Sequence, residues 1–60
     1  MQLHIRLGEV LTPELILAYS EHIRDFLVLE GVRPDPNDLA ATELTERQIK
    51  ELLEELAEEN

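Results

Sequence analysis

LTPELILAYSEHIRDFLVLEGV, residues 11–32, carries the longest regular pattern in the chain. Thr12 can cap free backbone N–H groups, and Pro13 suits the first helical position, where its missing N–H is not needed. Gly31 can adopt the left-handed conformation that closes a helix. These signals predict one helix over residues 13–30.

Apolar residues fall on two sides of this predicted helix. At about 100° per residue, one broad apolar arc is expected to face the core. The arc comprises Leu15, Ile16, Tyr19, Ile23, Phe26 and Leu27, with His22 and Leu29 at its edge. On the opposite side Leu17 and Val28 are nearly superimposed in projection, among charged residues that include Glu21 and Arg24. Either residues 33–44 cover Leu17 and Val28, or another protein does.

The N-terminal residues 2–7 alternate between apolar and polar side chains, with Leu3, Ile5 and Leu7 on one side. This period predicts a half-buried strand. A single strand leaves unpaired backbone groups and therefore needs a neighbour. Residues 40–44 are a weak candidate within the chain. A homodimer through the N-terminal strand, or a strand from a different protein, is the open alternative.

Residues 31–44 form a predicted linker that contains the chain's main turn signals. Asp35 followed by Pro36 repeats the logic of a helix start, so a short helical turn through residues 39–41 is favoured. A strand over residues 39–44 stays open as the alternative.

A second helix is predicted over residues 46–59. Thr45 and Gln48 have the spacing of a capping box, which satisfies free N–H groups at a helix start. The apolar side chains fall on one narrow arc, formed by Ile49, Leu52, Leu53, Leu56 and Ala57. The expected fold is a single domain over residues 1–60, mainly α in an α+β class. An N-terminal strand or extended arm precedes two main helices, with a possible short helical turn between them.

Charge and composition restrict the partners. The 60 residues contain fourteen acids and five bases, for a formal net charge of −9. Nucleic acid is therefore not the expected partner, since phosphate contacts need clustered Lys and Arg. A protein with a basic surface, or no partner at all, fits better. No apolar run reaches about 18 residues and no basic leader precedes a hydrophobic segment, so we expect no membrane contact, no signal peptide, and cytoplasmic or recombinant production.

Residues capable of chemistry do not form a recognised pattern. His22 and Asp25 lie near each other on the predicted helix, and His4 is the other histidine, but no metal-ligand motif such as HExxH joins them. Ser20 and His22 point about 200° apart on a helix. There is no cysteine and no glycine-rich phosphate loop. We therefore predict no enzyme activity and no catalytic, cofactor-binding or metal site.

The order of a short strand and two helices resembles the ribbon–helix–helix repressors, in which two chains pair their strands and outward side chains enter the major groove. The resemblance implies that Gln2, His4 and Arg6 would be those side chains. Two departures weaken it: the segment 31–44 is long, and acids open the second helix.

A second resemblance covers more of the chain. The capping box, the strict apolar spacing and the Glu, Lys and Leu content of residues 43–60 resemble computationally designed mini-proteins. The absence of cysteine and the single methionine agree with this. Residues 33–42 and the mixed faces of the first helix depart from an idealised scaffold, which implies a surface shaped by a target.

These observations predict a non-enzymatic protein-binding module, a designed binder or inhibitor that occludes a partner through its long helix. The expected partner-binding residues are Leu17, Glu21, Arg24 and Val28. The alternative is a natural small acidic regulator, either a phage-type inhibitor or a dimeric repressor of the ribbon–helix–helix type. For the inhibitor, the carboxylates expected to mimic nucleic acid are Glu51, Glu54, Glu55 and Glu58.

Overall fold

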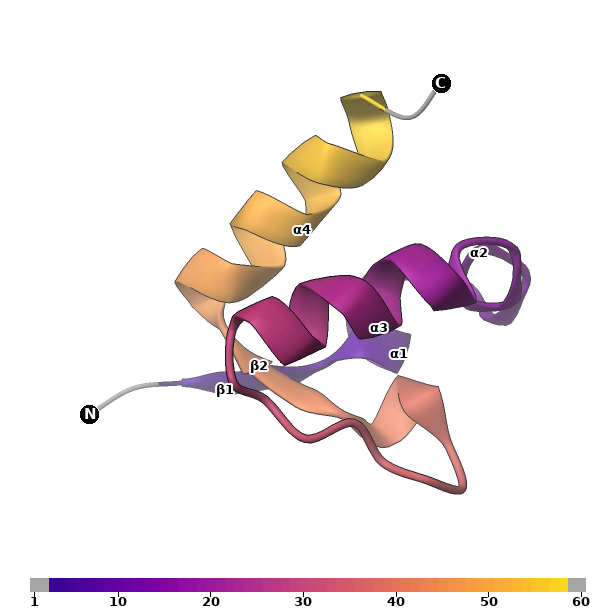
Figure 1. Cartoon of the computed structure of the whole chain (residues 1–60), viewed down its shortest axis with the longest axis horizontal. Helices are drawn as coiled ribbons and strands as arrows, with labels where there is room; N and C mark the ends of the chain where they lie inside the picture. The colour runs from indigo at the N-terminus through magenta and orange to yellow at the C-terminus, as the bar shows by residue number, and fades with distance from the viewer. Residues whose placement is uncertain (1–2, 59–60) are drawn as a thin grey trace.

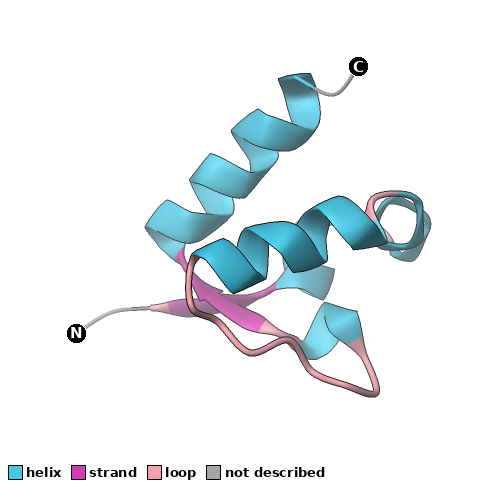
Figure 2. Cartoon of the chain, in the orientation of Figure 1, coloured by secondary structure: helices cyan, strands magenta, loops and turns pink. Residues whose placement is uncertain are grey.

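The computed structural model describes residues 3–58. Its elements in chain order are β1 (His4–Arg6), α1 (Leu7–Val10), α2 (Pro13–Ala18), α3 (Ser20–Leu29), the 3-10 helix η1 (Leu39–Ala41), β2 (Glu43–Thr45) and α4 (Glu46–Glu58). Helices make up most of the described chain, and the two strands form one small sheet (Figure 2). The predicted class, mainly α within α+β, is confirmed.

The sheet lies below α3 and α4 in Figure 1. β1 and β2 pair antiparallel, with Ile5 opposite Leu44. The partner of the N-terminal strand thus lies in the same chain. The strand is shorter than the predicted range 2–7: residue 2 lies outside the described residues, and Leu7 already begins α1. The chain turns into this helix because the Glu9 side chain accepts a hydrogen bond from the Arg6 N–H, at 3.0 Å.

The single helix predicted over residues 13–30 is wrong, because the chain bends at Tyr19. This residue has φ −110° and ψ 22°, outside helical values, and separates α2 from α3. Figure 1 shows α2 almost end-on and α3 across the view, so their axes differ clearly. The start of α2 is as predicted, since the Leu15 N–H donates to Thr12 Oγ1 at 3.2 Å.

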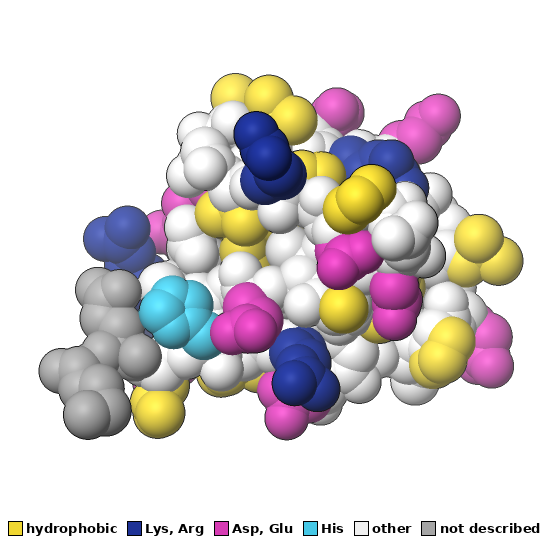
Figure 3. All heavy atoms as spheres, turned by 90° about the horizontal axis from the view of Figure 1, so that it is seen from below, with side chains coloured by type: hydrophobic (Ala, Val, Ile, Leu, Met, Phe, Trp, Pro, Cys, Tyr) yellow, Lys and Arg dark blue, Asp and Glu magenta, His cyan; other side chains and the backbone are white. Residues whose placement is uncertain are grey.

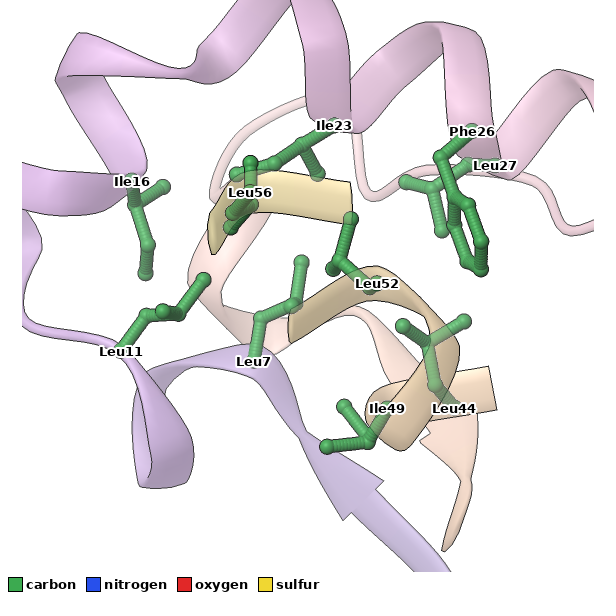
Figure 4. Packing of buried hydrophobic residues seen from close by; sticks show 10 residues of the cluster. All are labelled: Leu7, Leu11, Ile16, Ile23, Phe26, Leu27, Leu44, Ile49, Leu52 and Leu56. Atoms are coloured by element: carbon green, nitrogen blue, oxygen red, sulfur yellow. The ribbon is translucent and has the colours of Figure 1, made fainter. Parts of the chain in front are cut away.

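Tertiary packing accounts for the bend. α2 contacts α1 and η1, whereas α3 extends over the centre of the molecule. Ile16 of α2 points toward Leu11 in Figure 4, while Ile23 and Leu27 of α3 point toward the leucines of α4 and β2. Packing commonly overrides local helix propensity in this way. Leu15 was predicted to face the core, but it is 42% exposed, so the predicted core face is wrong at this residue.

Gly31 ends the helical segment as predicted. Its φ is +73°, which is the left-handed conformation. The Val32 N–H donates to the Leu27 carbonyl at 2.8 Å, and the Gly31 N–H donates to the Val28 carbonyl at 3.1 Å. This arrangement satisfies carbonyl groups that a helix end otherwise leaves free.

The segment between α3 and α4 contains both a helical turn and a strand, in succession. The predicted turn is η1, but its cap is Asp38, whose Oδ1 accepts from the Ala40 N–H at 3.1 Å. Asp35, the predicted cap, instead accepts from the N–H groups of Asn37 and Asp38 within the preceding turn. Thr42 is buried, and its Oγ1 accepts from the Asp35 N–H at 3.0 Å. The loop is therefore tied to the base of β2.

α4 begins with the predicted capping box. The Gln48 N–H donates to Thr45 Oγ1, and the Thr45 N–H donates to Gln48 Oε1. Its buried residues are Ile49, Leu52 and Leu56, whereas Leu53 is 39% exposed and Ala57 is exposed. The apolar arc facing the core is therefore narrower than predicted. Residue 59, the predicted end of this helix, lies outside the described residues.

The core lies between the sheet and the helices. Figure 4 shows side chains from β2 and all four α-helices pointing toward one another. Its buried apolar members are Leu7, Leu11, Ile16, Ile23, Phe26, Leu27, Leu44, Ile49, Leu52 and Leu56. Within residues 3–58, no helix combines the length and the apolar character needed to cross a membrane.

Candidate functional site

The outward side of α2 and α3 carries the predicted partner-binding residues. Leu17 is 78% exposed and Val28 is 71% exposed. Glu21 and Arg24 are also exposed. The alternative in which residues 33–44 cover Leu17 and Val28 is therefore wrong.

The bend at Tyr19 changes how these residues are grouped. Glu21, Arg24 and Val28 all belong to α3, where spacings of three and four residues place them on one face. Leu17 belongs to α2, whose axis points in a different direction (Figure 1). The expected superposition of Leu17 on Val28 assumed a straight helix. The structure therefore groups three of the four predicted residues on one face and sets Leu17 at an angle to them.

A groove between α3 and α4 was not predicted as a site. Its volume is about 400 Å³, and its lining residues are Phe26, Leu29, Glu30, Glu51, Glu54, Glu55 and Glu58. Leu29 was expected at the edge of the core face, but it is 84% exposed. The available sequence signal was the run of acids in residues 51–58, which has no base among them.

Polar contacts at both ends of the groove join α3 and its C-terminal cap to α4. Gln48 Nε2 donates to Glu30 Oε1 at 3.3 Å, near the end of α3 and the start of α4. His22 Nε2 lies 4.0 Å from Glu55 Oε1, near the start of α3 and toward the end of α4. The two helices thus run in opposite directions along the groove. These contacts involve two of the five groove glutamates.

The groove carries only negative charge among its described residues. All five ionisable residues that line it are glutamates, and its two apolar residues are Phe26 and Leu29. Figure 3 shows a different face, seen from below the sheet, where Lys and Arg side chains lie close to acids and apolar side chains form separate groups. Carboxylates gathered in a hollow concentrate a negative potential there. The groove can therefore attract cationic groups.

The described histidines do not gather with the groove glutamates into a metal site. Among the described residues, no three His, Asp or Glu side chains are grouped so that they could hold a metal ion. His22, which the sequence placed near Asp25, lies beside Glu55 of α4. His4 is on β1, and its side chain is exposed.

Comparisons with protein-family models, curated proteins and solved structures found no match to this chain.

Proposed function

We propose that this chain is a non-enzymatic protein-binding module that occludes a partner surface with the outward side of α2 and α3. The supporting observation is the exposure of two large apolar side chains, Leu17 at 78% and Val28 at 71%, among charged residues. Burying these side chains against a partner removes apolar surface from water, which favours association.

The charges beside Val28 indicate the chemistry of the partner. Glu21 and Arg24 lie on the same face of α3 and carry opposite signs. A matching partner presents an apolar pocket for Val28, a basic group opposite Glu21 and an acidic group opposite Arg24. Such complementary pairs fix the orientation of a complex more than they raise its affinity.

A designed origin is part of this proposal. It is supported by the agreement between local signals and structure at three helix ends: the caps at Thr12 and Thr45 and the left-handed Gly31. Designed scaffolds combine such features deliberately.

A natural acidic inhibitor is the second candidate function. It is favoured by the groove, because Glu51, Glu54, Glu55 and Glu58 line one hollow instead of scattering around α4. The repressor alternative gains no comparable support. In that family the N-terminal strands of two chains pair with each other, whereas here β1 pairs with β2 of the same chain.

The proposed surface is tested with Leu17→Glu/Val28→Glu. Wild type and the double variant are each used as bait. Each protein that a bait retains is purified, and its affinity for both chains is measured by calorimetry. We expect a partner that binds the double variant about a hundredfold or more weakly than it binds wild type, because two apolar anchors are replaced by solvated charges.

Leu3→Glu is the matched control. Leu3 is 68% exposed and precedes β1, so the same chemical change is made away from α2 and α3. This variant should retain the affinity within about twofold. Purified partners that bind the double variant as tightly as wild type would disprove the proposed surface. Loss of binding on neutralising Glu51, Glu54, Glu55 and Glu58, with no effect of Leu17→Glu/Val28→Glu, would favour the acidic inhibitor.

A further inference from the structure

We propose that the groove between α3 and α4 is a second docking site, which takes a basic amphipathic segment of another protein. The segment places one large apolar side chain against Leu29 and Phe26, and its Lys or Arg side chains pair with the groove glutamates. This inference goes beyond the proposed surface on α2 and α3, since the groove does not include Leu17 or Val28, and it names the partner chemistry for the groove of the second candidate function.

The apolar part of the groove is available to a ligand. Leu29 has the highest exposed fraction of any large hydrophobic residue in the described chain, at 84%, and Phe26 lies beneath the surface at 6%. Both line the same hollow. An apolar side chain placed there would contact Phe26 and shield Leu29 from water.

The rim determines the charge of the ligand. Among the described residues, five glutamates line the groove and no Lys or Arg does. Glu30 and Glu55 have polar neighbours across the groove, in Gln48 and His22. Glu51, Glu54 and Glu58 add three further carboxylates, so cationic side chains would reduce the mutual repulsion of the rim.

Other occupants fit less well. A wholly apolar helix would remove the glutamates from water without giving them partners, which is unfavourable. A bare or hydrated cation would make no use of Leu29. A second copy of the chain carries the same net charge of −9, so charge opposes docking of one copy on another.

The dimensions suit a short segment. The groove of about 400 Å³ lies within the range of ligand sites, about 300–1,000 Å³. Glu51 and Glu58 are separated by about 10 Å along α4, or about two helical turns. A segment of similar length can therefore reach the glutamates along the groove while its apolar side chain meets Leu29.

The probe is a short fluorescein-labelled peptide with leucine at every third or fourth position and lysine elsewhere. Two matched peptides replace leucine by serine or lysine by glutamate. Fluorescence anisotropy is measured at about 20 mM and about 200 mM NaCl, since screening weakens charge pairing. We expect saturable binding of the first peptide only, weaker at the higher salt concentration.

Variants of the protein locate the binding. Glu54→Gln/Glu58→Gln should weaken binding about fivefold, because it removes two rim charges. Glu43→Gln/Glu46→Gln removes the same charge from exposed positions outside the groove and should change affinity less than about twofold. Leu29→Ser should also weaken binding about fivefold, whereas Leu3→Ser should not.

Several outcomes would overturn the assignment. Equal losses in the two Glu→Gln pairs would mean that only the overall charge attracts the peptide. If Leu29→Ser binds the peptide as tightly as wild type, Leu29 does not contact the peptide and the proposed apolar contact is wrong. Self-association that Leu29→Ser abolishes, observed by sedimentation, would make a second copy the occupant. Failure of this site leaves the test with Leu17→Glu/Val28→Glu unaffected, so the two proposals are judged separately.

Discussion

At the scale of single residues, the two glycines are required for different physical reasons. Gly31 has φ +73°, and a Cβ added there would meet no atom within 4 Å, so only backbone conformation restricts the position. A Cβ on Gly8 would lie 3.2 Å from the Ala40 Cβ and 3.3 Å from the Ala40 carbonyl oxygen. Gly8 therefore allows α1 to approach η1 closely.

Gly31→Ala should lower the free energy of unfolding by about 1 kcal/mol, because alanine is disfavoured in the left-handed conformation. The measurement is urea denaturation followed by circular dichroism. Gly31→Asn should be less destabilising, since asparagine tolerates this conformation better. Equal stability of the alanine variant and wild type would contradict the role assigned to this glycine.

Gly8→Ala should also destabilise, but through contact with Ala40. The double variant Gly8→Ala/Ala40→Gly removes the opposing Cβ and should recover part of the lost stability, a coupling that a double-mutant cycle measures. Additive losses would show that the contact with η1 does not limit this position.

At the scale of elements, hydrogen bonds at the ends determine where helices start. The capping box of α4 joins Thr45, the last residue of β2, to Gln48 in the first turn. The same residue thus belongs to the sheet and begins the helix. This dual position fixes the direction in which α4 leaves the sheet.

Thr45→Ala should destabilise the protein by about 1 kcal/mol, because the Gln48 N–H loses its acceptor. Thr45→Ser keeps a hydroxyl oxygen and should retain most of the stability. Thermal unfolding of the three chains provides the comparison. A serine variant as unstable as the alanine variant would mean that the threonine methyl group, not the cap, stabilises this position.

Local signals predicted the elements better than their arrangement. The caps at Thr12 and Thr45 and the left-handed Gly31 depend on neighbours in sequence, and all three were predicted. No proline or glycine lies near Tyr19 to indicate a bend in the sequence. It depends on packing of α2 against α1 and η1, which neighbouring residues do not encode.

The candidate surfaces divide in the same way. The placement of Leu17 and Val28 opposite the apolar arc was predicted from the pattern of one helix. Whether residues 33–44 cover these two side chains stayed open until the structure showed them exposed. The groove could not be predicted from either helix alone, because Leu29 and Glu54 come from different elements and meet only through the packing of α3 beside α4. The run of acids in residues 51–58 indicated charge but not a concave surface.

At the scale of the whole molecule, the charge distribution opposes stability. The net charge is −9. On α4, Glu51 and Glu55 are four residues apart, as are Glu54 and Glu58, and like charges at this spacing destabilise a helix. Acids near a helix C-terminus also interact unfavourably with its dipole. The acidic groove therefore lowers the stability of the free protein.

Glu58→Gln should raise the free energy of unfolding by about 0.5 kcal/mol, since it removes the like-charge pairs with Glu54 and Glu55 and one unfavourable dipole interaction. Adding NaCl should raise the midpoint of thermal unfolding of wild type, and by less in the variant. Scanning calorimetry measures both effects. A lower midpoint at high salt would contradict net repulsion.

The pairing of β1 with β2 also affects the rate of folding. Ile5 lies opposite Leu44, so the sheet closes a loop of about 40 residues, which costs about 3 kcal/mol of chain entropy. The helices can form from local contacts within microseconds, but the sheet must wait for distant segments to meet. Ribosomal synthesis adds a further delay, because β1 emerges long before its partner strand. Until residues 43–45 are available, the backbone of β1 is open to pairing with other chains.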